Sequence, residues 1–103
     1  MEVWVRSQDK ERFLLIKGVR FCKYKKGYFE KNKTLKEIAE SEDAYGVDCN
    51  GEIFGEYATK ERCLEIIDEI QRLLVNNGST EDRISAKVSG IQNNFIVYEM
   101  PKE

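Results

Sequence analysis

Hydrophobic and polar residues alternate along several short stretches of the chain, and alternation with a period of two predicts β-strands. Near the start, Val3 and Val5 fall on one side of such a strand and Trp4 falls on the other. The dipeptide Asn50-Gly51 suits the positive φ angles of a two-residue hairpin turn. We therefore expect strands, two of them joined by this turn, at residues 2–6, 12–17, 19–24, 44–49, 52–58 and 94–100.

A different spacing marks residues 60–76, where apolar residues recur every three or four positions and predict a long amphipathic helix. Thr59 stands before it as a candidate N-cap. A second, short helix is predicted near residues 34–42, with Thr34 as its cap. Residues 79–91 fit either a helix or a strand.

These elements predict an α+β fold in which an antiparallel sheet of about five to six strands packs against one long amphipathic helix. The chain has 103 residues, which is close to the commonest domain size, so we expect a single domain over residues 1–103. A small sheet also has edges to cover, and a two-fold homodimer would cover them.

The amino-acid composition excludes several kinds of catalytic and metal-binding site. The sequence contains no histidine, which removes the usual general base at neutral pH and most mixed zinc sites. There is no glycine-rich phosphate loop and no acidic calcium loop, so we expect a protein that is not an enzyme and that needs no cofactor or metal. Cys22, Cys49 and Cys63 are odd in number and widely spaced, which favours reduced thiols.

No apolar run approaches the length needed to span a bilayer, and the first residues lack the features of a signal peptide. We therefore expect a cytoplasmic protein with no membrane partner.

Charge is divided into two blocks along the sequence. Residues 17–36 contain eight basic side chains and one acidic one, a net charge of +7. Residues 37–69 contain eleven acidic side chains and two basic ones, a net charge of −9. The two blocks either lie apart and steer charged partners, or lie together in the fold and neutralise one another.

Each block suggests a function of its own. Acidic residues could take the place of phosphates in a partner's nucleic-acid groove, and the candidates are Glu37, Glu40, Glu42 and Asp43. The basic block interleaves lysines with aromatic rings, a composition typical of surfaces that bind nucleic acids or nucleotides. Its candidate residues are Lys23, Tyr24, Lys25, Lys26 and Tyr28.

Three stretches of the chain are similar to segments of a known group of proteins. They are Trp4-Val5-Arg6-Ser7-Gln8-Asp9-Lys10, Gly55-Glu56-Tyr57-Ala58-Thr59-Lys60-Glu61 with the helix start that follows, and Tyr98-Glu99-Met100-Pro101. Together they resemble small accessory proteins of phages and prophages of Gram-positive bacteria. The resemblance implies a phage-encoded, anti-CRISPR-like inhibitor that binds a bacterial defence protein or ribonucleoprotein and occludes a nucleic-acid site. The alternative is a module that binds or sequesters nucleic acids or cyclic nucleotides through residues 17–36.

Overall fold

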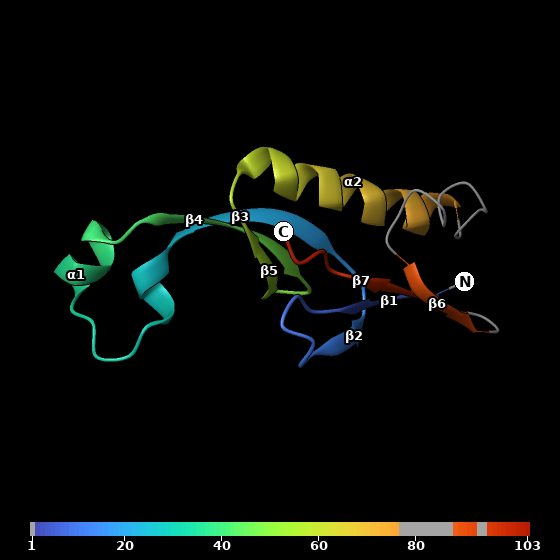
Figure 1. The fold of residues 1–103 in the computed structure, drawn as a ribbon, viewed down its shortest axis with the longest axis horizontal. Helices are drawn as coiled ribbons and strands as arrows, with labels where there is room; N and C mark the ends of the chain where they lie inside the picture. Colours follow the sequence, from blue (N-terminus) through green and yellow to red (C-terminus); the bar gives the residue numbers. More distant parts are fainter. Residues whose placement is uncertain (1, 77–87, 93–94) are drawn as a thin grey trace.

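The computed structural model describes residues 2–76, 88–92 and 95–103. Within them the chain forms a series of strands, a 3₁₀ helix (η1) and two α-helices (Figure 1). The strands are β1 (Glu2–Arg6), β2 (Phe13–Leu15), β3 (Val19–Lys25), β4 (Asp43–Cys49), β5 (Glu52–Tyr57), β6 (Val88–Gln92) and β7 (Phe95–Glu99). The helices are η1 (Lys26–Phe29), α1 (Leu35–Glu40) and α2 (Lys60–Asn76).

The strands form two sheets rather than one. The first has the order β2-β1-β7-β6 and is mixed, because β1 runs antiparallel to β2 but parallel to β7. The second has the order β3-β4-β5 and is antiparallel throughout. The α+β class is confirmed, but the prediction of a single antiparallel sheet is wrong. The parallel pair joins the two ends of the chain, and local alternation carries no information about so distant a partner.

The main helix α2 lies across the second sheet, as predicted (Figure 1). Thr59 caps it by accepting a hydrogen bond of 3.1 Å from the Arg62 backbone N–H. Its apolar face is fully buried in the core at Cys63, Ile66, Ile70 and Leu73. No helix in the described ranges is long and apolar enough to cross a membrane. The short helix α1 is also where the sequence placed it.

The three cysteines are free thiols, in agreement with the sequence. Cys49 and Cys63 are buried, and Cys22 is only partly buried. Burial raises the pKa of the Cys49 thiol to about 12, which keeps it protonated and unreactive.

One outer edge of the second sheet is covered by a side chain. Gln8, in the loop between β1 and β2, donates its backbone N–H to the carbonyl of Phe54 on β5 at 2.8 Å. Its side-chain amide accepts from the Glu56 N–H at 2.8 Å and donates to the Glu56 carbonyl at 3.0 Å. The amide thereby imitates one residue of a neighbouring strand, so the edge of β5 has its hydrogen bonds satisfied from within the chain.

The turn between β4 and β5 ties two parts of the fold together. Asn50 and Gly51 have φ angles of 55° and 92°, as the hairpin prediction requires. The Asn50 carboxamide also reaches the junction of β2 and β3, where its oxygen accepts from the N–H groups of Lys17 at 2.8 Å and Gly18 at 3.0 Å. Its nitrogen donates to the Leu15 carbonyl at 2.9 Å. The turn therefore anchors the link between the two sheets.

Two substitutions of Asn50 separate the contribution of its side-chain hydrogen bonds from that of its backbone conformation. Asn50→Gly keeps the backbone conformation but loses the three side-chain hydrogen bonds, so we expect it to lower the free energy of unfolding by about 1–3 kcal/mol. Asn50→Ala loses the same hydrogen bonds but keeps a β-carbon in the left-handed region, a strain that glycine avoids and that asparagine tolerates better than alanine, so it should cost about 1 kcal/mol more than Asn50→Gly. Urea denaturation measures both. Asn32→Gly is the control, because Asn32 has a φ angle of 63° in an exposed loop and should change little. An Asn50→Gly variant as stable as the native chain would contradict the anchoring role.

Candidate functional site

The two charge blocks meet along β3 and β4. These strands pair antiparallel with Lys25 opposite Asp43, so the basic block folds directly onto the start of the acidic block. The intervening residues 26–42 project beyond the sheet as an arm that contains η1 and α1 (Figure 1). The molecule is correspondingly elongated, with extents of 49 × 24 × 20 Å. This arm contains or adjoins all the residues that the sequence proposed for binding.

Close contacts within the arm hold its two helices together. Gly27 is buried, and its N–H donates to the Ser41 hydroxyl at 2.9 Å. The same hydroxyl donates to the Ile38 carbonyl at 2.6 Å. A β-carbon at Gly27 would lie 3.2 Å from the Ile38 α-carbon, a tight contact that the glycine avoids where η1 approaches α1.

Ion pairs along the base of the arm join candidate residues from both proposed sites. Asp43 lies 2.8 Å from the Lys25 ammonium and 3.6 Å from that of Lys23, and Glu42 lies 3.4 Å from that of Lys26. The hydrogen bond from Lys25 is the main cause that lowers the pKa of Asp43. The stabilisation is present above the ordinary aspartate pKa and disappears as the pH falls through the lowered folded-state value. The two blocks therefore neutralise one another at this point.

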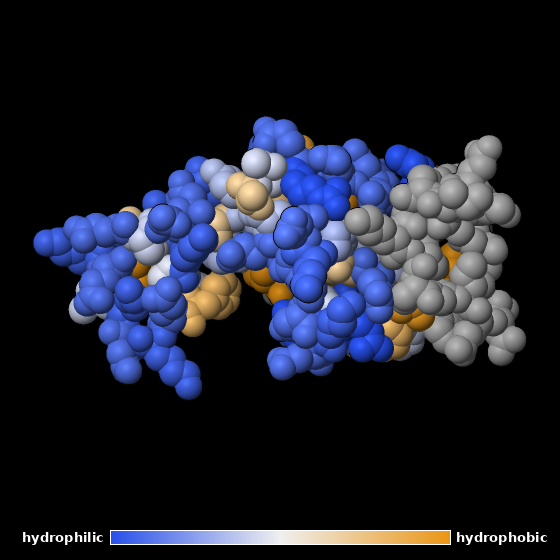
Figure 2. Space-filling model, in the orientation of Figure 1, coloured by the Kyte–Doolittle hydropathy of each residue, from blue (hydrophilic) through white to orange (hydrophobic). Residues whose placement is uncertain are grey.

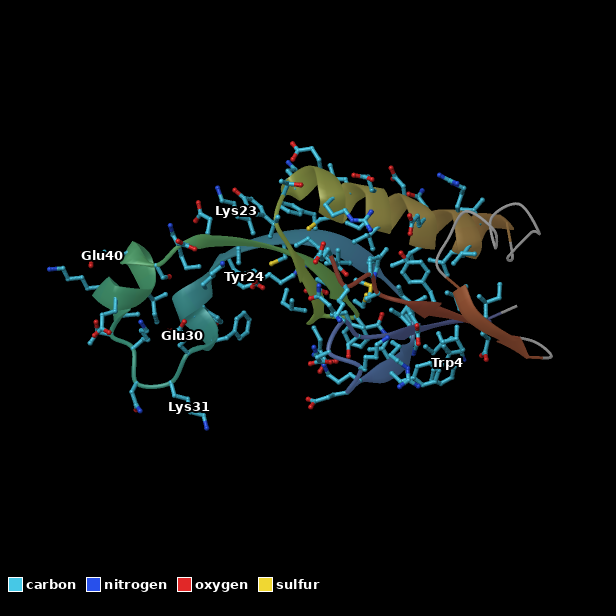
Figure 3. The ribbon with its side chains drawn as sticks, viewed as in Figure 1. Trp4, Lys23, Tyr24, Glu30, Lys31 and Glu40 are labelled. Carbon is cyan, nitrogen blue, oxygen red and sulfur yellow. The ribbon has the colours of Figure 1, made fainter. Side chains whose placement is uncertain are left out.

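The other two acidic candidates lie on α1. The Glu37 backbone N–H donates to the Thr34 hydroxyl at 3.2 Å, and the Thr34 hydroxyl donates to the Glu37 carboxylate at 3.1 Å, so this side chain takes part in capping the helix. Glu40 is exposed on α1, in the outer part of the arm (Figure 3). Helix α1 buries none of its residues, and its Leu35 side chain is 86% exposed.

Lys23 and Tyr24 lie on opposite faces of β3, as neighbours in a strand must (Figure 3). The Tyr24 hydroxyl donates to the Glu56 carboxylate at 2.7 Å, and its ring meets Phe29 edge to face at 5.3 Å between centroids. Burial, followed by this hydrogen bond, raises the pKa of the Tyr24 phenol. Tyr28 packs on Phe29 but remains 68% exposed. The structure therefore does not gather the lysines and both tyrosines on one face.

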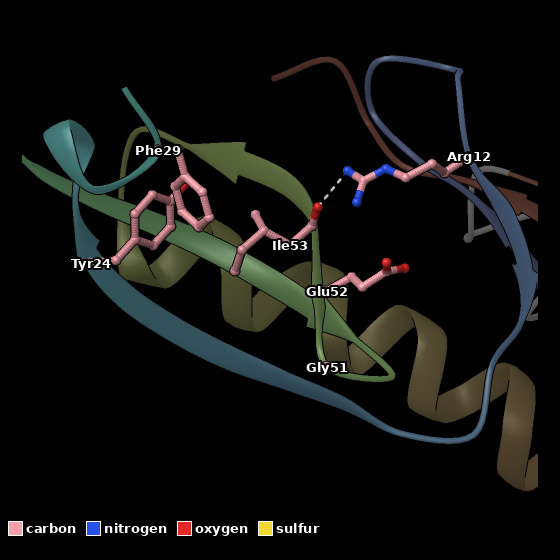
Figure 4. A pocket seen from close by; sticks show the side chains of 6 residues that line it. All are labelled: Arg12, Tyr24, Phe29, Gly51, Glu52 and Ile53. Atoms are coloured by element: carbon pink, nitrogen blue, oxygen red, sulfur yellow. Dashed lines mark hydrogen bonds between the residues drawn. The ribbon is translucent and has the colours of Figure 1, made fainter. Parts of the chain in front are cut away.

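A hollow of about 440 Å³ opens beside Tyr24 where the arm joins the sheet (Figure 4). Arg12 forms its opposite side, donating to the Ile53 carbonyl at 2.6 Å and lying 4.9 Å from the centroid of the Phe54 ring. Apolar side chains reach the surface in this region (Figure 2). The hollow is lined by Arg12, Tyr24, Phe29, Gly51, Glu52 and Ile53.

Sequence reasoning identified only Tyr24 among the residues of this hollow. The sequence pattern places Arg12 and Ile53 at ordinary strand positions, and Phe29 falls within the basic-aromatic segment 17–36. The exposure of Leu35 carries no sequence signal either, because its spacing with Ile38 is typical of a buried helix face. An exposed apolar residue looks the same in sequence as a buried one when the surface it would pack against is absent.

Comparisons with known protein families, with curated proteins and with solved structures found no match. In the described part of the chain, no group of three or more cysteine and carboxylate side chains is placed to hold a metal ion. The geometry of the arm and the hollow is therefore the basis for the functional argument.

The ion pairs at the base of the arm lead to a test of the nucleic-acid alternative. Replacing Glu42→Gln and Asp43→Asn together would free Lys23, Lys25 and Lys26 for phosphates. We expect the native chain to bind a labelled single-stranded RNA weakly, and the double variant to bind more tightly with a log–log salt slope steeper by about 1–2. Fluorescence anisotropy at several salt concentrations measures both quantities.

The control for this experiment is Glu52→Gln with Glu61→Gln, which changes the net charge equally but lies outside these ion pairs. A control that gains as much affinity would show that only total charge matters. Absence of binding by any variant at low salt would contradict the alternative altogether.

Proposed function

We propose that this chain is a non-enzymatic binding protein that docks on another protein through its arm and the adjoining hollow. The observation that carries the proposal is the exposure of large apolar side chains on the arm. Tyr28 is 68% exposed, Phe29 63% and Leu35 86%. Aromatic residues are enriched at the centres of protein interfaces, where they supply most of the binding energy.

The charge of the arm supports a protein partner over a nucleic acid. Residues 26–42 contain four lysines and four glutamates, so the arm is neutral overall. Strong binding to a phosphate backbone depends on lysines and arginines that are free to replace counterions. The three lysines proposed for nucleotide binding are instead in ion pairs with Glu42 and Asp43.

The proposed partner is a bacterial defence protein whose nucleic-acid site the chain covers, as expected of an anti-CRISPR-like phage inhibitor. The resemblance of the chain to phage accessory proteins is the basis for this choice. A small protein that binds stoichiometrically needs no catalytic group. The absence of histidine from the sequence and the elongated arm fit that mode of action. Glu40 and Glu37, on the exposed helix α1, would meet the basic rim of the partner's site.

Capture from nuclease-treated bacterial lysate, with quantitative mass spectrometry, tests the proposal. The native chain should recover a defence protein, and the variant with Tyr28→Ser and Leu35→Ser should recover at least about tenfold less. Both side chains are exposed and contribute little to the core, so stability should change by no more than about 0.5 kcal/mol for each.

The matched control is Val75→Ser on α2, because Val75 is 69% exposed and lies outside the arm. It should capture as much partner as the native chain does. Equal capture by the arm variant, or recovery of no defence protein by any variant, would contradict the proposal. A recovered partner should also lose its affinity for nucleic acid when the native chain is added.

A further inference from the structure

The outer edge of β3 is open. Hydrogen bonds at both ends of the strand show which way its backbone faces, because the Lys26 N–H donates to the Glu42 carbonyl and the Asn50 N–H donates to the Gly18 carbonyl. Even-numbered residues therefore direct their backbone groups toward β4. Odd-numbered residues direct theirs outward, and within the described ranges no strand pairs with that edge. The outward residues are Val19, Phe21, Lys23 and Lys25.

We propose that this edge pairs with β3 of a second copy of the chain, forming a two-fold dimer with one continuous sheet of three strands from each copy. A two-fold axis perpendicular to the sheet must place one residue opposite its own counterpart. Centring on Phe21 would set Lys17 against Lys25, and centring on Lys23 would set that lysine against itself. Among these three registers, which pair most of β3, only the one centred on Cys22 opposes no two basic residues, so repulsion favours that register.

The register centred on Cys22 also makes favourable cross-strand pairs. It sets Arg20 opposite Tyr24 of the second copy, and Phe21 opposite Lys23. Each pair combines a cation with an aromatic ring, an arrangement that stabilises paired strands. In this register the edge can therefore pair with itself without placing two basic residues directly opposite each other. Phe21 and Lys23 face outward and would exchange backbone hydrogen bonds with each other, while Cys22 would form the closer, non-hydrogen-bonded pair.

A second observation concerns one flank of α2. The Lys60 ammonium lies 5.2 Å from the centroid of the Phe21 ring, so this flank faces the β3 side of the sheet. Leu64, Ile67 and Leu74 follow Lys60 at helical spacing, and Leu64 and Leu74 are 41% and 39% exposed. Because α2 packs over β3 and β4, the proposed pairing would bring the two copies of α2 to about 10 Å apart. That is an ordinary packing distance for helices, and it would bury these leucines.

Light scattering coupled to size-exclusion chromatography tests the dimer with the full chain. The native protein should show about twice the 12.0 kDa of one chain. Lys23→Pro removes an outward N–H and spares the bonds to β4, since proline is tolerated where an edge strand faces outward. We expect this variant to keep the native circular dichroism and to be monomeric. Lys23→Ala, which also loses the ion pair to Asp43, should remain dimeric.

Cysteine cross-linking tests the register. A non-hydrogen-bonded antiparallel pair has α-carbons about 4.5 Å apart, within the range that a disulfide spans. Mild oxidation should therefore link native chains through Cys22, since Cys49 and Cys63 are buried, and Cys22→Ser should abolish the link. Lys23→Cys in the Cys22→Ser background is the control. The two new thiols would share the sheet face opposite to that of Cys22 and would lie diagonally, about 7–8 Å apart, so they should link far more slowly.

Each outcome decides the proposal. A native chain that is monomeric at the highest concentration reached would overturn it. A dimer that persists in Lys23→Pro and does not link through Cys22 would show assembly through another surface and would overturn it equally. These measurements need no partner protein, and the exposed arm residues Tyr28 and Leu35 lie outside the paired strand. A monomeric chain would therefore not contradict the proposed function. Failure to capture a defence protein would likewise not contradict the dimer.

Discussion

The antiparallel pairing of β3 with β4 is the constraint on which the rest of the structure depends. Its register places Lys25 opposite Asp43, so a strongly basic segment and a strongly acidic segment become neighbours. The ion pairs are partly exposed, and each contributes little to stability alone. They also occupy the ammonium groups of Lys23, Lys25 and Lys26 with carboxylates of the same chain. The pairing also determines where the arm leaves the sheet and which edge of β3 faces outward.

The second sheet is tied to the first at the ends of the chain. The parallel pair of β1 and β7 is followed by a backbone hydrogen bond from Met100 to the Arg6 carbonyl at 3.1 Å. The Tyr57 hydroxyl of the second sheet donates to the Pro101 carbonyl at 2.7 Å, and its burial is the main cause that raises the pKa of that phenol. The last residues are therefore packed against both sheets. The two sheets joined in this way form the base from which the arm extends.

Local patterns predicted most of the secondary structure, because each depends on neighbours in sequence. Thr59, the three- and four-residue spacing after it, and Asn50-Gly51 gave α2 and the hairpin correctly. The division into two sheets could not be predicted, because the partner of β1 lies some ninety residues away. The hollow could not be predicted either. The Arg12 side chain, just before β2, reaches the backbone carbonyl of Ile53 on β5 of the other sheet, and neither residue carries a local signal.

The two edge strands of the second sheet differ in whether another strand could pair with them. On β5, Gln8 and Arg12 bind the outward carbonyls of Phe54, Glu56 and Ile53, which blocks the addition of another strand. On β3 there is no such cover among the described residues, and basic side chains alone discourage pairing. Lysines on an edge oppose a partner strand only in registers where like charges meet. With Cys22 at the two-fold axis no two lysines stand opposite each other, so Lys23 and Lys25 would exclude the registers centred on Phe21 and Lys23 and permit this one.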